Sequence, residues 1–241
     1  MIAIYKKEMR TYFTTPLGYV FLAVSLFVSA FAFALTTYYS SDPTSNTTSY
    51  FTIMIFLMAI FLPILTMRSF SEERRTKTDQ LLFTSPISIA SLVIGKFLSA
   101  LSMFLIYVAF SLINLIPLYA NVAQNASQPN LALIVGNLMA LILVGACFIA
   151  IGIFASTLTE NSAVAMVITI GILIGLLFIY FINLLIDVPV LETIFEWLSI
   201  YGRFSSFTYG VFDIASLIYY LSLTGLFLFL SERVFQVRRL G

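Results

Sequence analysis

The sequence predicts an all-α membrane protein with six transmembrane helices, and its composition and its apolar runs are the observations that predict this fold. Of the 241 residues, 61% are hydrophobic and 10% are charged, whereas soluble domains carry about 25% charged residues. The apolar residues gather into runs that reach the length of about 20 residues needed to cross a bilayer. Within a single membrane domain over residues 1–241, we expect spans at about 17–39, 50–67, 89–119, 131–158, 162–186 and 214–230.

Residues 1–16 are predicted to form a helix in the plane of the membrane interface. On a helix, one face carries the apolar side chains Ile2, Tyr5, Met9, Tyr12 and Phe13. Lys6, Lys7 and Arg10 fall on the opposite face, which is typical of helices that lie against anionic headgroups. The alternative is a merely basic flank ahead of the first span. Thr15-Pro16 interrupts the helix and lets the chain turn into the bilayer.

The most polar stretch of the chain, residues 68–80, follows the second span and holds seven of the 23 charged residues. Ser69-x-x-Glu72 has the form of a capping box, in which the two side chains satisfy free amides at a helix start. Thr84-Ser-Pro86 would stop this helix, so we predict a helix over residues 69–84. A charged segment in so apolar a chain lies in water, and a soluble partner would bind there. The alternative is a solvated charge run without a partner.

The third, fourth and fifth spans carry polar or small residues at informative positions. Lys96 lies near the start of the third span, and we expect its amine to reach the headgroups. The fourth span contains Gly136, Gly145 and Gly152, which let helices approach closely. The fifth span contains Gly171-x-x-x-Gly175, which predicts a packing face within the chain or, as the alternative, an interface with another subunit.

Residues 187–213 separate the fifth and sixth spans, and within them residues 190–199 are too short and too charged to form another span. Asp187-Val-Pro189 is predicted to start a short helix with Pro189 at its first position. Aromatic residues and helix-breaking glycines then follow. This combination is typical of a re-entrant element at the outer membrane interface.

The basic residues indicate the orientation of the chain in the membrane. With six spans, the termini, the 68–88 segment and the turn at 156–161 share one side. Eleven basic residues fall on that side: Lys6, Lys7, Arg10, Arg68, Arg74, Arg75, Lys77, Lys96, Arg233, Arg238 and Arg239. Only Arg203 falls opposite. Because basic residues are enriched on the cytoplasmic side of membrane proteins, we predict that both termini and the 69–84 helix are cytoplasmic.

Composition excludes several classes of function. The chain has no histidine and a single cysteine, and its net charge is +1. Metal sites built from histidine, disulfides and binding of nucleic acid are therefore not expected, and we interpret Cys147 as a small buried hydrophobe. Gly95-Lys96 lacks the other residues of a phosphate-binding loop. No span has an ionisable residue near its middle, as ion-driven carriers usually need. An external motor that binds the 69–84 helix is the simplest source of energy.

Three segments bear a family resemblance: residues 4–16, residues 72–88, and residues 209–213 with the following Tyr219-Tyr220. In them the chain resembles the permeases of type-2 ABC exporters, the ABC-2 or type V family. It is most similar to permeases of the gliding-motility and nitrous-oxide-reductase maturation type. In the 72–88 segment, Lys77 stands where the family typically has glycine, and Gln80 stands where it has a second glutamate. Any role of that second carboxylate is therefore not carried over.

The resemblance implies a non-catalytic permease subunit in the bacterial cytoplasmic membrane, which works as part of an ABC exporter. It implies two ABC ATPase subunits, which would bind ATP and Mg, and a second permease that is either identical or homologous. Neither a cofactor nor a metal is expected on this chain. Membrane lipids and an additional membrane-anchored subunit are further candidate partners.

The resemblance also implies that residues 1–16 and the 69–84 helix contact the ATPases, and that the 69–84 helix acts as a coupling helix. The residues expected at this contact are Lys6, Lys7, Arg10, Glu72, Glu73, Arg74 and Arg75, with Leu81 and Leu82 as a wedge against the spans. Gly171 and Gly175 are candidates for the transport path or the dimer face. The alternatives are a membrane scaffold that docks a cytoplasmic partner and, less well supported by the residues, an intramembrane lipid-modifying enzyme.

Overall fold

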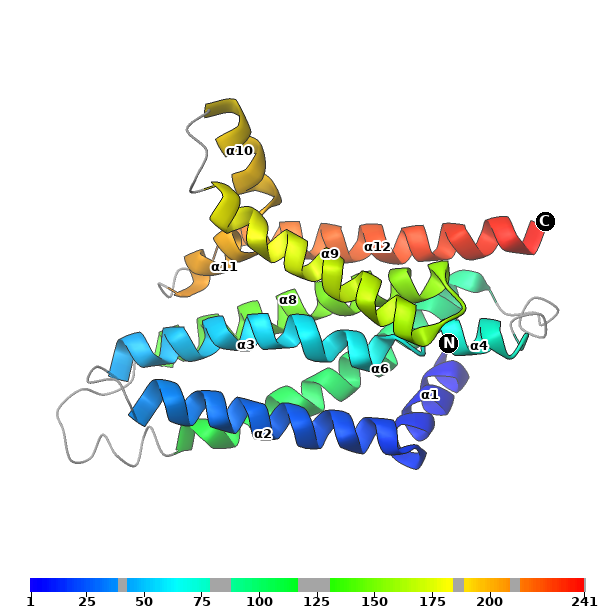
Figure 1. Ribbon diagram of the computed structural model, residues 1–241, viewed down its shortest axis with the longest axis horizontal. Helices are drawn as coiled ribbons and strands as arrows, with labels where there is room; N and C mark the ends of the chain where they lie inside the picture. The colour runs from blue at the N-terminus through cyan, green and yellow to red at the C-terminus, as the bar shows by residue number, and fades with distance from the viewer. Residues whose placement is uncertain (39–42, 79–87, 117–130, 184–188, 209–212, 241) are drawn as a thin grey trace.

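The computed structural model describes residues 1–38, 43–78, 88–116, 131–183, 189–208 and 213–240. In these ranges the chain is helical and has no strand (Figure 1). Six helices in the described part are long and apolar enough to cross a membrane, which confirms the predicted fold class. They are α2 (Pro16–Tyr38), α3 (Pro43–Thr66), α6 (Ile89–Ser111), α8 (Leu131–Leu158), α9 (Ser162–Asn183) and α12 (Ile214–Leu240).

The shorter helices lie at the two ends of this bundle. The helix α1 (Ile2–Thr14) lies across one end, where α4 (Ser71–Arg75) and both chain termini are also found (Figure 1). At the opposite end lie α10 (Pro189–Leu198), which projects from the bundle, and α11 (Ile200–Thr208) (Figure 1). Both termini therefore share one end, as an even number of spans requires.

The helix α8 forms the centre of the bundle and packs against α3, α6, α9 and α12. Its glycines make this close packing possible. A Cβ atom at Gly145 would collide with the Phe104 ring of α6, and one at Gly152 would collide with the Thr66 side chain of α3. Cys147, between these glycines, is fully buried, as the sequence predicted.

Several helix ends differ from the sequence prediction. The second span was expected to begin at Tyr50, but α3 already begins at Pro43, because proline is favourable in the first turn of a helix. In the third span α6 ends at Ser111 and is followed by the 3₁₀ turn η1 (Leu112–Leu115), whereas the predicted end at Tyr119 lies outside the described residues. The sixth was expected to end at Leu230, yet α12 continues to Leu240, since nothing in that segment breaks a helix.

The predicted 69–84 helix is the largest departure. In the structure α4 ends at Arg75, and a turn follows in which Lys77 has a positive φ of 56°. Such a left-handed residue ends a helix and favours glycine, the residue that the permeases resembled by the sequence typically have at this position. Leu81 and Leu82 lie outside the described residues.

The predicted capping box at the start of this helix is also absent. Phe70, not Ser69, occupies the N-cap position of α4, and no side chain caps the helix. The reason is tertiary: Phe70 is fully buried against the Phe235 ring of α12, with a centroid separation of 4.6 Å. That packing fixes where the chain turns before α4.

The glycine motif of α9 packs against no other described part of the chain. Among the described residues, a Cβ atom at Gly171 or Gly175 would have no neighbour within 4 Å. The same face of α9 exposes Val167, Ile174 and Phe178. Of the two interpretations of this motif, the packing face within the chain is therefore wrong.

Candidate functional site

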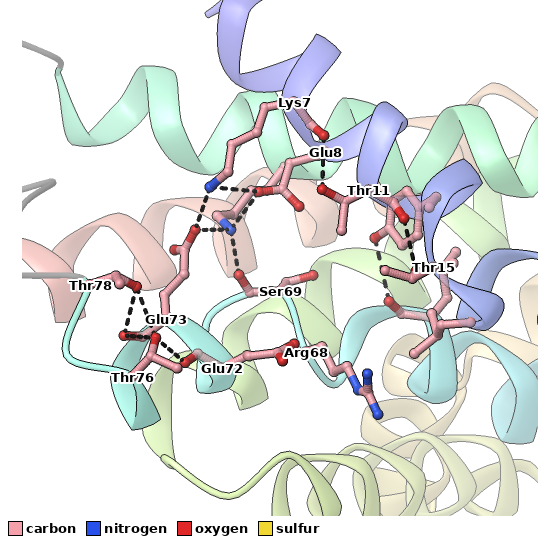
Figure 2. Close-up of a pocket in the computed structure, with 14 residues that line it drawn as sticks. Lys7, Glu8, Thr11, Thr15, Arg68, Ser69, Glu72, Glu73, Thr76 and Thr78 are labelled. Carbon is pink, nitrogen blue, oxygen red and sulfur yellow. Dashed lines mark hydrogen bonds and ion pairs between the residues drawn. The ribbon is translucent and has the colours of Figure 1, made fainter.

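A cavity of about 300 Å³, lined mostly by charged and hydroxyl-bearing residues, lies between α1, α4 and the start of α6. Figure 2 shows Lys7 and Glu8 of α1 facing Glu73 of α4 across it. The cavity lies at the end of the bundle that carries both termini, and it unites residues that are far apart in the sequence. Its lining includes Lys7, Glu8, Thr11, Tyr12, Arg68, Ser69, Glu72, Glu73, Thr76, Thr78 and Lys96.

Lys96 of α6 is at the centre of this site, and it is only 2% exposed. Its Nζ lies 3.0 Å from Glu8 Oε1 and 2.9 Å from Glu73 Oε1. The same amine donates a hydrogen bond to the Ser69 carbonyl oxygen and lies 4.8 Å from the centroid of the Phe70 ring. The prediction that Lys96 reaches the headgroups is therefore wrong, because acids from α1 and α4 cover it.

Lys7 completes the charged cluster at the rim of the cavity. Its Nζ lies 3.3 Å from Glu73 Oε1 and 3.8 Å from Glu8 Oε1, and its side chain is largely exposed. Together Lys7, Glu8, Glu73 and Lys96 sum to a formal charge of zero. We call these four residues the charged cluster. Removing a charge from water is costly unless a partner compensates it, so their mutual pairing is what permits Lys96 to be buried.

The carboxylate of Glu73 is not fully satisfied within the described part of the chain. Its Oε1 atom accepts from Lys7 and pairs with Lys96, whereas its Oε2 atom is buried and has no hydrogen-bond partner there. A buried oxygen without a donor is unfavourable. The cavity beside it is wide enough to admit a water molecule or a donor from another chain.

The helix α1 is held against α6 by close packing on a glycine and by a hydrogen bond between side chains. Ile4 packs onto Gly95, where a Cβ atom would lie 3.1 Å from the Ile4 side chain. The hydroxyl groups of Tyr5 and Ser102 are 3.0 Å apart and share a hydrogen bond. These contacts place Glu8, one helical turn after Ile4, directly over Lys96.

Tyr12 fixes the second half of α1 to the end of α3. Its hydroxyl donates a hydrogen bond of 3.4 Å to the Leu65 carbonyl oxygen, in a buried position. Burial, assisted by the negative charge of Glu8, raises the pKa of Tyr12, so the phenol keeps its proton and its donor role. Of the residues predicted to face the membrane, Tyr12 is thus buried in protein, while Ile2 and Phe13 are exposed.

Arg74 attaches α4 to the opposite side of the bundle. Its guanidinium donates a hydrogen bond of 3.1 Å to the Thr157 carbonyl oxygen at the end of α8. A second donor lies 3.0 Å from Glu160 Oε1, in the turn between α8 and α9. Adjacent residues of one short helix, Glu73 and Arg74, therefore hold α4 to different parts of the molecule.

Only some of the residues that the sequence placed at the partner contact are exposed in the structure. Glu73 and Arg74 point into the protein, whereas Glu72 and Arg75 are exposed. Lys6 and Arg10 of α1 are exposed as well, and Lys7 joins the charged cluster. In the part of the chain that the structure describes, no group of acidic or cysteine side chains is arranged to hold a metal ion.

Sequence reasoning missed Glu8 and the buried role of Lys96. A signal for Lys96 exists, because it stands seven residues after Ile89 in an apolar run, about 10 Å along the helix axis. Glu8 is the single acid among the basic residues of 1–16. A lone acid in a basic helix and a lone base in an apolar helix are candidates for a pair.

A comparison with protein families places this geometry in context. The family model described as "ABC-2 family transporter protein" matches residues 2–216, a range that includes α1, α4, α6 and the whole charged cluster. A comparison with curated proteins finds no match.

Proposed function

Since this chain belongs to the ABC-2 family of transporter proteins and is a permease subunit of an ABC transporter, we propose that it exports substrate using ATP hydrolysed on separate subunits. Those subunits bind the end of the bundle formed by α1 and α4. The observation that carries this proposal is the double attachment of α4, through Glu73 to α6 and α1 and through Arg74 to the α8–α9 turn.

The double attachment gives a partner a way to move the spans. A force on the exposed residues of α4, Glu72 and Arg75, passes through Glu73 to α6 and through Arg74 to α8. Separating Lys96 from its acids would leave buried charge uncompensated, which costs about 3–5 kcal/mol. α1, α4 and the start of α6 therefore move as one unit when the ATPase subunits close.

The remaining parts of the proposal concern orientation and partners. The excess of basic residues at the end with α1 and α4 supports a cytoplasmic location of that end and of both termini, in the bacterial inner membrane. Two ATPase subunits, which hold ATP and Mg, would dock there. The exposed face of α9 with Gly171 and Gly175 supports contact with a second permease, identical or homologous, because small residues let helices approach closely. Within the family, the 72–88 segment supports the gliding-motility and nitrous-oxide maturation type.

The test is a charge exchange on the exposed residues of α4. We expect the double variant Glu72→Lys, Arg75→Glu to keep its thermal stability and its place in the membrane, but to lose most of the ATPase subunit that co-purifies with the tagged permease. The matched control is Glu232→Lys with Arg233→Glu, an exchange of the same kind on α12. Unchanged ATPase content in the α4 variant would contradict the proposed contact. Binding of an ATPase whose hydrolysis rate does not respond to the permease would indicate a scaffold instead.

A further inference from the structure

The guanidinium of Arg203 in α11 lies over two aromatic rings at the end of the bundle opposite α1. Its guanidinium carbon is 4.9 Å from the centroid of the Trp197 ring of α10 and 4.6 Å from that of the Tyr219 ring of α12. Among the described residues, its side chain makes these cation–π contacts but no hydrogen bond or ion pair. Its Nε atom is buried and has no partner there. Within the described part of the chain, this cation is held in place while its donors are unused.

A guanidinium that lies over aromatic rings can still bind another group through its N–H donors. The five donors lie in the plane of the group, so rings that contact its flat faces leave them free. Donors fixed in a planar fork match the oxygens of a phosphate or carboxylate, which can accept two parallel hydrogen bonds. Arg203 is therefore prepared for an anion.

The described acid whose charge interacts with Arg203, Asp213, is occupied by other donors. Asp213, at the start of α12, accepts hydrogen bonds of 3.0 Å from the Ala215 amide and 3.2 Å from the Ser216 amide, and a further one from the Ser216 hydroxyl. These bonds cap α12. Asp213 therefore attracts Arg203 at a distance but does not pair with it.

The site is preformed, because both tyrosines at the start of α12 fix the junction of α10 and α11. Tyr219 donates a hydrogen bond of 2.9 Å to the Leu198 carbonyl oxygen. Tyr220 donates one of 2.8 Å to the Ile200 carbonyl oxygen. Tyr219 thus holds the junction and also supplies one of the rings beside Arg203, so little ordering is required when an anion binds.

The surroundings of Arg203 identify the source of the anion. Trp197 is 66% exposed, and the apolar side chains of Ile194 and Leu198 on the same helix are about half exposed. Tryptophan is enriched where acyl chains meet headgroups, and α10 projects from the membrane-spanning bundle (Figure 1). Exposed apolar side chains beside an unused cation match a molecule that has acyl chains and a phosphate.

We propose that Arg203 binds the phosphate group of an anionic membrane phospholipid, whose acyl chains contact Ile194 and Leu198 of α10. The lipid phosphate supplies acceptors for the guanidinium donors, and Trp197 and Tyr219 keep the fork in position. The lipid thereby fastens α10 to the membrane surface at the end of the bundle opposite the charged cluster.

Trp197 makes this proposal directly testable, since it is the single tryptophan of the chain and one of the rings beside Arg203. The purified full chain in an alkyl maltoside detergent, which contains no phosphate, is titrated with phosphatidylglycerol carrying brominated acyl chains. Bromine quenches tryptophan fluorescence at short range. We expect saturable quenching at a low mole fraction of lipid, and only weak, unsaturated quenching by brominated diacylglycerol, which lacks the phosphate. Equal quenching by both lipids overturns the proposal.

Substitutions of Arg203 test whether the lipid-dependent quenching requires its guanidinium. We expect Arg203→Gln to weaken the apparent affinity about tenfold, because it removes hydrogen bonds to a charged group, and Arg203→Lys to have a smaller effect. Arg233 is the matched control, since its guanidinium carbon lies 4.9 Å from the centroid of the Phe229 ring at the other end of α12. Arg233→Gln should leave quenching unchanged.

A folded Arg203→Gln protein with wild-type affinity contradicts the proposal. Reversal of the quenching by millimolar inorganic phosphate would show a site for free phosphate and overturn the lipid assignment. If Arg203→Gln does not fold, the comparison of the two brominated lipids on the unchanged protein still decides.

Discussion

Lys96 of α6 and Glu73 of α4 form an ion pair of 2.9 Å, although 22 residues separate them in the sequence and the lysine is 2% exposed. Glu8 adds a second carboxylate from α1 at 3.0 Å. Three segments therefore meet on one amine. In the proposed transporter, this amine joins α4, which belongs to the docking surface, to the membrane span α6. The docking surface and the span therefore move together.

The first prediction concerns the free energy of unfolding that depends on this amine. We expect Lys96→Met to destabilise the protein by about 3–5 kcal/mol, because Glu8 and Glu73 then share a single base, Lys7, and one buried negative charge is left uncompensated. Adding Glu73→Gln to Lys96→Met should recover part of the loss, because one buried charge disappears. Thermal unfolding of the four proteins of this double-mutant cycle in detergent measures the coupling. Additive losses would show that the two side chains do not interact.

The second prediction compares adjacent arginines with different surroundings. Arg74→Ala removes a part-buried hydrogen bond to the Thr157 carbonyl oxygen, so we expect a loss of about 1–3 kcal/mol. The pair with Glu160 adds little, because that carboxylate is mostly exposed and screened by solvent. Arg75 is exposed, and Arg75→Ala should change stability by less than about 0.5 kcal/mol. Chemical or thermal unfolding distinguishes the two variants, and equal losses would be inconsistent with this arrangement of α4.

The third prediction tests the turn that ends α4. Lys77 has φ 56°, a conformation that costs a residue with a Cβ atom about 1–2 kcal/mol. After allowing for the flexibility of glycine in the unfolded chain, Lys77→Gly should stabilise the protein by about 0.5–1 kcal/mol. Thr76→Gly is the control, since Thr76 has a right-handed helical conformation and gains nothing from glycine. Melting temperatures that fall equally for both variants would show that the turn stores no strain.

The fourth prediction concerns the cap of α12 and its dependence on pH. The Ser216 hydroxyl, followed by the amides of Ala215 and Ser216, lowers the pKa of the Asp213 carboxyl below its ordinary value of 3.8. A lowered pKa means that the ionised carboxylate stabilises the folded state above pH 3.8, and that this contribution is lost as the pH falls through the lowered pKa.

We therefore expect Asp213→Ala to cost about 1 kcal/mol at neutral pH and less in acid. Asp213→Asn keeps a side-chain acceptor and should retain most of the cap, without its pH dependence. Thermal unfolding between neutral and acidic pH measures the difference between wild type and the two variants. A difference that grows on acidification would have the wrong sign.

The fifth prediction separates packing within the chain from pairing between chains. Gly171→Leu places a side chain into open space on α9, so the stability of the single chain should change by less than about 0.5 kcal/mol. If this face contacts a second permease, the same substitution should abolish cross-linking between copies or to the homologous chain. Gly145→Leu is the contrast, because it collides with Phe104 and should destabilise by at least about 1–3 kcal/mol. Intact cross-linking in a folded Gly171→Leu protein would place the interface elsewhere.

Local properties of the sequence determined the spans and the breaks between them. The six apolar runs predict six helices, because a backbone in lipid must satisfy its own hydrogen bonds. Thr15-Pro16 predicts the break between α1 and α2, because the residue before proline is driven to an extended conformation, and Thr15 has ψ 152°. Pro189 predicts the start of α10 for the same kind of local reason.

Only the tertiary structure decided which charged residues face inward. Glu72 and Glu73 are chemically identical neighbours, yet one is exposed and the other joins the charged cluster, because helix geometry turns successive side chains about 100° apart. The length of α4 was likewise set by the burial of Phe70 and by the turn at Lys77, not by the capping pattern. Lys96 is buried because α1 folds back over α6 and brings Glu8 to it. A hydrophobic pattern reports the neighbours of a residue along the chain, whereas the energy of a buried charge depends on the neighbours that folding brings to it through space.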